Sequence, residues 1–209
     1  MKTHLFLLRH GATKLNLEVP YRLQGNEHDE PINDIGEAQA AGARDLLRSV
    51  PLRAFYSSPL QRAMKTAQIV AVPHALDVVP IHELREGSVG LWSNRTWDDI
   101  KSKERAAFDL FMQNPAKHGY VGGENFTQVL ERVRPVFHEL VRKHAGESIA
   151  VMGHQIVNRV IVADLLGLDL AKARKLKFAN AGVSLISVED NEPHLVSLNI
   201  SWPAMVLPK

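Results

Sequence analysis

The chain has no cysteine among its 209 residues. This absence excludes disulfide bonds, thiolate catalysis and cysteine-ligated zinc, and it fits a cytoplasmic protein. Long hydrophobic runs are missing as well. The apolar run near the N terminus covers only Leu5 to Leu8, whereas a membrane span needs roughly 18 apolar residues and an export signal needs a longer core than this. We therefore expect a cytoplasmic protein with no membrane partner.

A strong charge of one sign is also missing. The 25 basic and 23 acidic residues give a formal net charge of +2, and the two signs are interleaved. Because no basic stripe with intervening aromatic residues is present, we do not expect a nucleic-acid partner. No Pro-, Gly- or Ser-rich tract divides the chain. Length and composition therefore predict a single domain over residues 1–209.

What is present is a pattern of short apolar runs that end in polar residues. The run Leu5 to Leu8 stops at Arg9 and His10, and a second run over 148–152 stops just before His154. Such runs predict buried strands of a parallel sheet. Ligands bind at the carboxyl edge of such a sheet, so this edge is the expected site. Further strands are predicted over 52–57, 77–81, 183–188 and 194–199, the last two as a hairpin around 190–191.

Helices are predicted between these strands. Asn33 or Asp34 is expected to cap the first, with Glu37 completing a capping box and Ile35 and Leu46 on its buried face. Further helices are predicted up to about residue 72 and over 96–114, 124–144 and 156–166, with a kink at Pro135 in the fourth.

Two local patterns add candidate residues to the predicted edge. Ser58 before Pro59 is typical of a helix start, which places Arg62 in the first helical turn, near Arg9. Glu86 precedes Gly87, where the backbone can turn sharply and present a carboxylate to a cleft. Glu83 is an alternative of the same residue type. Residues 95–145, with a flap-like break over 115–123, are expected to form a helical cap over the active site.

The histidines and arginines together favour phosphate chemistry. Arg9 and Arg62 suit a tetrahedral dianion, because guanidinium groups match phosphoryl oxygens and stabilise the charge on them. A central histidine can act as a nucleophile and form a phosphoramidate. Glu86 can then protonate the leaving oxygen and later take a proton from water.

Two other kinds of site are poorly supported. No His-x-x-x-His spacing occurs, and the arginines would repel a metal ion, so neither a metal nor a cofactor is expected. No Gly-x-Ser-x-Gly motif occurs either, which argues against a serine hydrolase.

Several motifs follow one another over nearly the whole chain. They are Leu8 to Thr13 with Asn16, Gln24-Gly25, Ile35 to Ala40, Ser58 to Ala63 with Thr66-Ala67, Leu84 to Glu86 with Gly90 and Trp92, Gly122 to Glu124, and Gly153-His154. Together they resemble the histidine phosphatase superfamily, in the branch that includes cofactor-dependent phosphoglycerate mutases.

The resemblance implies roles for the candidate residues. His10 would be the phosphorylated nucleophile and Glu86 the proton donor, while Arg9, Arg62 and His154 would form the phosphate pocket. It also implies a three-layer α/β/α sandwich with a mostly parallel sheet, a small phosphorylated metabolite as substrate, and no metal requirement. Either a monomer or a homodimer is expected. Further contacts to the phosphate or substrate are expected from Thr13, Asn16, Gln24, Gly25 and Gln155.

Three departures from the family pattern leave alternatives open. Ser93-Asn94 replaces a common Glu-Gly pair, Gln155 replaces a small residue, and the segment 25–29 is one residue longer, which leaves any role of Asp29 open. Mutases of the family carry a tyrosine where this chain has Val89, and an arginine pair that is absent here. Phosphomonoester hydrolysis is therefore favoured over a mutase. The third hypothesis is a weakly active member that binds a phosphorylated ligand for regulation.

Overall fold

The computed structural model describes residues 1–190 and 192–201. Its centre is a six-stranded sheet in the order β3-β2-β4-β1-β5-β6. The first four strands of that order are mutually parallel. β5 runs antiparallel to β1, and β6 runs antiparallel to β5. This confirms the mostly parallel sheet, while residue 191 of the predicted hairpin turn lies outside the described residues. The strands are β1 (Lys2–Arg9), β2 (Leu52–Ser57), β3 (Val78–Pro80), β4 (Ser148–Gly153), β5 (Val183–Glu189) and β6 (Glu192–Ile200).

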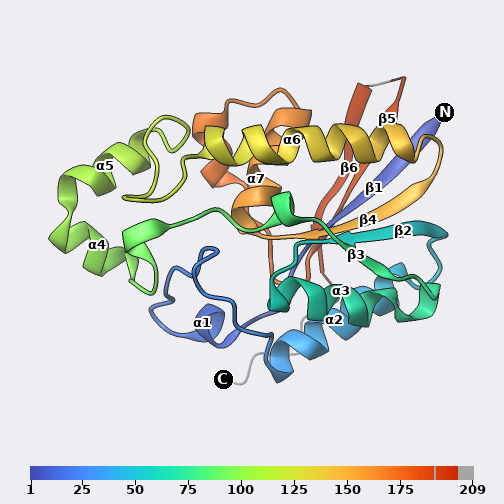
Figure 1. Ribbon diagram of the computed structural model, residues 1–209, viewed down its shortest axis with the longest axis horizontal. Helices are drawn as coiled ribbons and strands as arrows, with labels where there is room; N and C mark the ends of the chain where they lie inside the picture. Colours follow the sequence, from blue (N-terminus) through green and yellow to red (C-terminus); the bar gives the residue numbers. More distant parts are fainter. Residues whose placement is uncertain (191, 202–209) are drawn as a thin grey trace.

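Helices cover both faces of the sheet, which confirms the three-layer architecture (Figure 1). The helices α2 (Asp34–Leu47) and α3 (Gln61–Ala71) lie on one face, and α6 (Phe126–Lys143) and α7 (Gln155–Leu165) lie on the other. No helix within the described ranges is long and apolar enough to cross a membrane. The remaining helices are α1 (Lys14–Leu17), α4 (Trp97–Lys103), α5 (Arg105–Gln113) and the 3-10 turns η1 (Val72–His74), η2 (His82–Leu84), η3 (Gly90–Trp92) and η4 (Leu170–Lys175).

The central strands are buried on both faces, as the apolar runs predicted. Leu5 and Leu7 of β1 join the core under α6 and α7, while Leu8 packs with Phe55 on the side of α2 and α3. All four side chains are inaccessible to solvent. Burying each contributes about 1.5–3 kcal/mol of hydrophobic free energy, so this sheet is a rigid base for the side chains at its edge.

The start of α3 differs from the prediction. The helix begins at Gln61, after Leu60, and Ser58 does not cap it. The backbone N–H of Gln61 donates instead to Asp29 Oδ1 at 2.7 Å. A distant carboxylate therefore satisfies the helix end, which leaves Ser58 free for another contact.

The buried face of α2 also differs from the prediction. Asn33 caps the helix by accepting from Gly36 N at 2.9 Å, so Glu37 does not complete a capping box. Ile35 and Leu46 are exposed, and the buried face carries mainly small residues. A Cβ on Gly36 would lie 2.2 Å from the carbonyl oxygen of Ala12. Close backbone packing therefore selects small residues for this face.

The segment 95–145 does not form one unit over the cavity. The predicted helix over 96–114 breaks at Glu104, whose carboxylate accepts from Trp92 Nε1 and from Arg95, giving α4 and α5. Helix α6 packs on the sheet with Val133 and Phe137 in the core. The parts of this segment that reach the carboxyl edge of the sheet are α4, through Trp97, and the loop between α5 and α6, through Tyr120.

Candidate active site

A cavity of about 570 Å³ opens at the carboxyl edge of the parallel strands. The end of β1, the start of α7 and the loop after α1 contribute residues to its lining. Trp97 and Tyr120 form part of its wall. Most of the predicted residues line it: Arg9, His10, Asn16, Gln24, Gly25, Arg62, Glu86 and Gln155. Thr13 and His154 are not among the lining residues and are fully buried next to it.

The pairing of β1 with β4 brings the two histidines together. Arg9 is in register with Gly153, and His10 N donates to Gly153 O at 3.2 Å. The rings of His10 and His154 therefore lie side by side, with centroids 5.1 Å apart and an interplanar angle of 57°.

Hydrogen bonding fixes the tautomer of His10. Its Nδ1 lies 2.7 Å from the carbonyl oxygen of Gly11. Because a carbonyl can only accept, Nδ1 carries the proton, and Nε2 keeps its lone pair. Burial, followed by the charges of Arg62 and Arg9, holds the pKa of His10 well below its ordinary value. The imidazole is therefore neutral at neutral pH, as a nucleophile must be.

Ser58 holds the second histidine. Its Oγ lies 2.8 Å from His154 Nε2, and it also accepts from Leu60 N at 3.3 Å. Nδ1 of His154 is buried and has no hydrogen-bond partner among the described residues. Burial, followed by Arg62, lowers the pKa of His154 too. The sequence pattern assigned Ser58 to a helix cap, so this contact was missed.

Arg62 is almost completely buried, with 1% of its surface exposed. Its Nη1 donates to His28 O at 2.6 Å and its Nη2 to Gly25 O at 2.7 Å, so the loop over 24–29 wraps around the guanidinium. Burial lowers the pKa of Arg62, and the charge of Glu86 opposes that effect. The role of the longer 25–29 segment is thus visible: it anchors Arg62 and, through Asp29, the start of α3.

Arg9, like Arg62, is held by a backbone carbonyl oxygen. Its Nη1 donates to Phe178 O at 2.7 Å. Burial lowers the pKa of Arg9 to about 10, so the side chain stays protonated at neutral pH. The Nε atoms of Arg9 and Arg62 are buried without a partner in the described part of the chain. Buried donors of this kind call for an anion, because an unsatisfied charged donor is costly.

Glu86, and not Glu83, supplies the carboxylate of the cavity. Its Oε1 accepts from Gly87 N at 3.0 Å and from Ile156 N at 3.1 Å, at the first turn of α7. Glu83 is exposed and lies against a different surface hollow. The backbone donors fix the carboxylate of Glu86 in the cavity that His10 also lines, where it can exchange a proton with a bound group.

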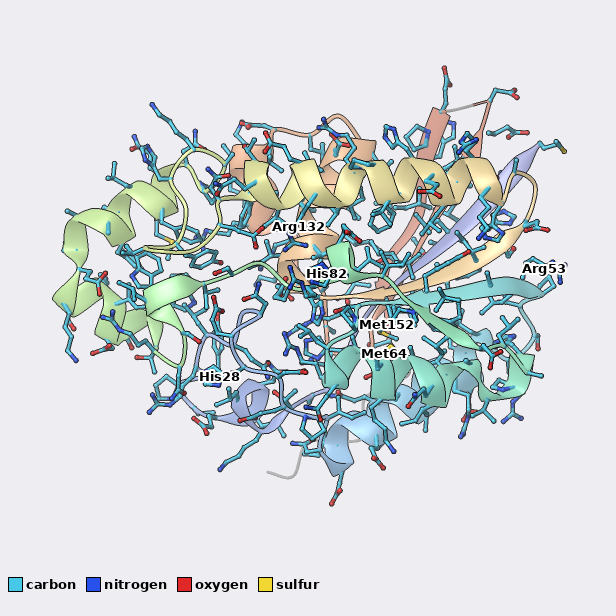
Figure 2. All side chains as sticks on the ribbon, in the orientation of Figure 1. His28, Arg53, Met64, His82, Arg132 and Met152 are labelled. Carbon is cyan, nitrogen blue, oxygen red and sulfur yellow. The ribbon has the colours of Figure 1, made fainter. Side chains whose placement is uncertain are left out.

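Arg132 of α6 positions the segment that carries Glu86. Its guanidinium donates to Arg85 O at 2.8 Å, to Glu86 O at 3.1 Å and also to Glu83 O. Nε of Arg132 binds Glu124 Oε1 at 2.8 Å. Figure 2 shows Arg132 reaching down from α6 toward the segment of His82. Glu124 belongs to one of the sequence motifs, whereas no sequence pattern indicated Arg132.

Polar residues in and after the α1 segment form a connected hydrogen-bond network at the cavity. Thr13 Oγ1 donates to Gln24 Oε1 at 3.3 Å, which leaves Gln24 Nε2 buried without a partner among the described residues. Asn16 Oδ1 accepts from Thr13 N and from Asn180 Nδ2, both at 3.2 Å. Thr13 thus orients Gln24, whose amide is available to a ligand. Asn180, which also donates to His10 O, was missed.

Gly11 packs against the start of α2. A Cβ on Gly11 would lie 2.5 Å from the carbonyl oxygen of Gly36. The lack of a side chain at Gly11 therefore allows α2 to pack closely against this segment. Neither Ser93 nor Asn94 lines the cavity, so that departure from the family pattern lies outside the described site. Gln155 does line it, and its Oε1 is buried without a partner among the described residues.

The arrangement can bind a tetrahedral anion against a neutral imidazole and offer a carboxylate for proton transfer. Within residues 1–190 and 192–201, no three His, Asp or Glu side chains are grouped as metal ligands.

Known proteins share both the sequence pattern and the fold. The chain is 28% identical over 197 residues to phosphoserine phosphatase 1 of Hydrogenobacter thermophilus, covering 94% of this chain and 92% of that one. It is 27% identical over 188 residues to a probable phosphoglycerate mutase, GpmB, of Salmonella paratyphi A, covering 90% and 86%. The structure of a mycobacterial glucosyl-3-phosphoglycerate phosphatase superposes with a TM-score of 0.85 at 26% identity, covering 96% of this chain and all of that one.

A family model extends this similarity over most of the chain. The model that describes the histidine phosphatase superfamily, branch 1, matches residues 5–201. That range contains every residue of the cavity described above. The chain therefore belongs to branch 1 of the histidine phosphatase superfamily.

Proposed function

We propose that the chain hydrolyses a small phosphomonoester through a phosphohistidine on His10, with positive charge supplied by Arg9 and Arg62 and no metal required. The observation that carries this proposal is the pair of neutral, buried imidazoles between two guanidiniums whose Nε donors have no partner among the described residues. Phosphomonoester hydrolysis also fits the phosphatases to which the chain is similar.

In the first step, Nε2 of His10 attacks phosphorus and forms an N–P bond. The P–O bond to the alcohol breaks, and a proton from Glu86 goes to the leaving oxygen. The equatorial oxygens take hydrogen bonds from Arg9 and Arg62. His154 contributes through Nδ1, which Ser58 leaves available. These donors stabilise charge where it develops in the transition state.

In the second step, water attacks the phosphohistidine. The carboxylate of Glu86 takes a proton from that water as the water oxygen forms a new P–O bond. The N–P bond breaks, its electron pair returns to Nε2 of His10, and inorganic phosphate leaves. The backbone donors from Gly87 and Ile156 hold the carboxylate in place for both proton transfers.

Hydrolysis is favoured over mutase activity by Val89. This side chain lines the cavity where mutases of the family carry a tyrosine, and it brings no hydrogen-bonding group to the substrate. A mutase must keep its phosphorylated intermediate from water, whereas a phosphatase admits water. A regulatory role without turnover is less favoured, because Ser93 and Asn94 do not line the cavity.

The test is turnover of p-nitrophenyl phosphate in a chelator, with His10→Asn as the variant. We expect loss of activity in His10→Asn, and a trapped label on His10 that is labile in acid and stable in base. His138→Asn, on the exposed face of α6, is the matched control. Retained activity in His10→Asn contradicts the proposal. In a coupled assay, isomerisation of phosphoglycerate faster than phosphate release establishes the mutase instead.

We further infer action in the cytoplasm, which the lack of cysteine fits. Either a monomer or a homodimer is compatible with a cavity built from one chain. Cell fractionation and light scattering of the purified protein measure these two properties.

A further inference from the structure

Arg159 of α7 lines the cavity beside the predicted phosphate pocket. Its Nε donates to Leu176 O at 2.7 Å, which fixes the side chain between α7 and the segment after η4. Lys177, one residue after that carbonyl, lines the cavity as well. Neither cation has an acidic side chain within 4 Å among the described residues.

The cavity therefore has more positive charge than a phosphate group needs. Its lining contains five cations and, within the described residues, one carboxylate, that of Glu86. One of the cations, Arg22, is paired with Glu18 at 3.0 Å. A phosphomonoester dianion offsets two charges of the remaining four cations while Glu86 is protonated, and three are offset once Glu86 is ionised. Positive charge is left over in both states. A partly buried cation without a counter-ion is costly, and a second anion would satisfy it.

The position of Arg159 indicates which part of the substrate it faces. Arg159 lies three residues after Ile156 on α7, and both residues line the cavity. Ile156 N donates to Glu86 Oε1 at 3.1 Å, so the cation lies about one helical turn from the residue that holds the proton donor. Since Glu86 protonates the leaving oxygen in the proposed reaction, Arg159 lies on the side of the leaving alcohol.

We infer that the alcohol portion of the substrate carries a second anionic group, a carboxylate or a phosphate, which binds Arg159 with help from Lys177. This inference rests on the proposed phosphatase reaction and specifies its substrate class. The cavity volume of about 570 Å³ fits a small metabolite with two charged ends.

Trp97 and Tyr21 limit the length of such a substrate. Trp97 Nε1 donates to Tyr21 Oη at 2.7 Å, which joins α4 to the loop after α1. Both residues line the cavity, as does the largely buried Tyr120. Three aromatic side chains therefore form part of the wall of the cavity.

The experiment compares three substrates with one carbon skeleton: glycerol 1-phosphate, 3-phosphoglycerate and glycerol 1,3-bisphosphate. We expect kcat/KM for at least one doubly charged substrate to exceed that for glycerol 1-phosphate by about 10- to 100-fold, the range of a hydrogen bond between charged groups. The preferred member identifies the second group as a carboxylate or a phosphate.

The variants are Arg159→Gln and Lys177→Gln, with Lys175→Gln as the matched control. Arg159→Gln is expected to abolish the preference ratio, and Lys177→Gln to reduce it by about 2- to 5-fold, as for an exposed charge. Lys175 is an exposed lysine of the same segment that does not line the cavity, so the preference ratio of Lys175→Gln should equal that of wild type.

Two outcomes overturn the inference. Either wild type shows no preference for a second anion, or Arg159→Gln lowers kcat/KM equally for all three substrates. Because Lys177 is exposed, its variant tests the same ratio even if Arg159→Gln fails to fold. Failure of the reaction itself is distinguishable. In that case p-nitrophenyl phosphate, which lacks a second anion, is not hydrolysed, or is hydrolysed by His10→Asn.

Discussion

Arg132→Met tests whether the segment that carries Glu86 must be held from α6. The guanidinium of Arg132 binds the carbonyl oxygens of Glu83, Arg85 and Glu86 and the carboxylate of Glu124. Methionine keeps much of the side-chain length but donates no hydrogen bonds. The carboxylate of Glu86 then keeps its contacts to Gly87 N and to Ile156 N at the start of α7, while the backbone that carries it is no longer held from α6.

Stability is expected to fall by about 2 kcal/mol, because hydrogen bonds to a charged group are lost while water partly replaces them. Arg132 and Glu124 are 20% and 23% exposed, so the loss is smaller than for a fully buried pair. For a chain of this length, that corresponds to a lower Tm by about 4–8 °C.

Activity should fall in a way that depends on the leaving group. A displacement of a catalytic group by about 1 Å can cost about 100-fold in rate. An alkyl phosphate needs its leaving oxygen protonated, so kcat/KM for glycerol 1-phosphate should fall by about 30- to 100-fold. p-Nitrophenolate leaves without a proton, so kcat/KM for its ester, which reports only the steps up to release of the alcohol, should fall by less than about 3-fold.

The assay measures kcat/KM for both substrates in wild type, Arg132→Met and Arg134→Met. Arg134 lies two residues further along α6 and forms an exposed ion pair with Asp164. Since surface pairs contribute about 0–1 kcal/mol, Arg134→Met should leave both rates unchanged. An equal loss for both substrates in Arg132→Met, or identical behaviour of the two variants, refutes the positioning role.

Three further predictions concern the two histidines and the packing around them. Gly11→Ala should destabilise by about 1–3 kcal/mol in urea unfolding, because its Cβ would meet Gly36 O at 2.5 Å; an unchanged midpoint contradicts this. Ser58→Ala should lower kcat/KM about tenfold, since His154 loses the hydrogen bond that orients it. A kcat/KM equal to that of wild type would show that Ser58 does not orient His154 for catalysis. The lowered pKa values of His10 and His154 mean that the unfolded chain binds more protons below about pH 6.5. Stability should therefore fall as pH falls through that value, and His10→Asn should flatten the slope measured by thermal unfolding.

Local sequence patterns predicted the elements of the fold well and their ends less well. Runs such as Leu5 to Leu8 are apolar without helical spacing, so the central strands were identified from the sequence alone. The predicted start of a helix was wrong where a residue far away in the sequence satisfies the first backbone N–H groups. At α3, Asp29 satisfies Gln61 N, and no local pattern around Ser58 reveals that.

The sequence by itself determined the residue types that a phosphohistidine enzyme needs and the strand ends that carry them. His10 and His154 follow apolar runs, and parallel pairing makes such ends neighbours. Tertiary structure alone decided how these groups are held and charged. The burial that lowers the pKa of His10, the loop that wraps Arg62 and the contacts of Arg132 all join residues far apart in the chain. Such contacts depend on three-dimensional packing, which local periodicity does not encode.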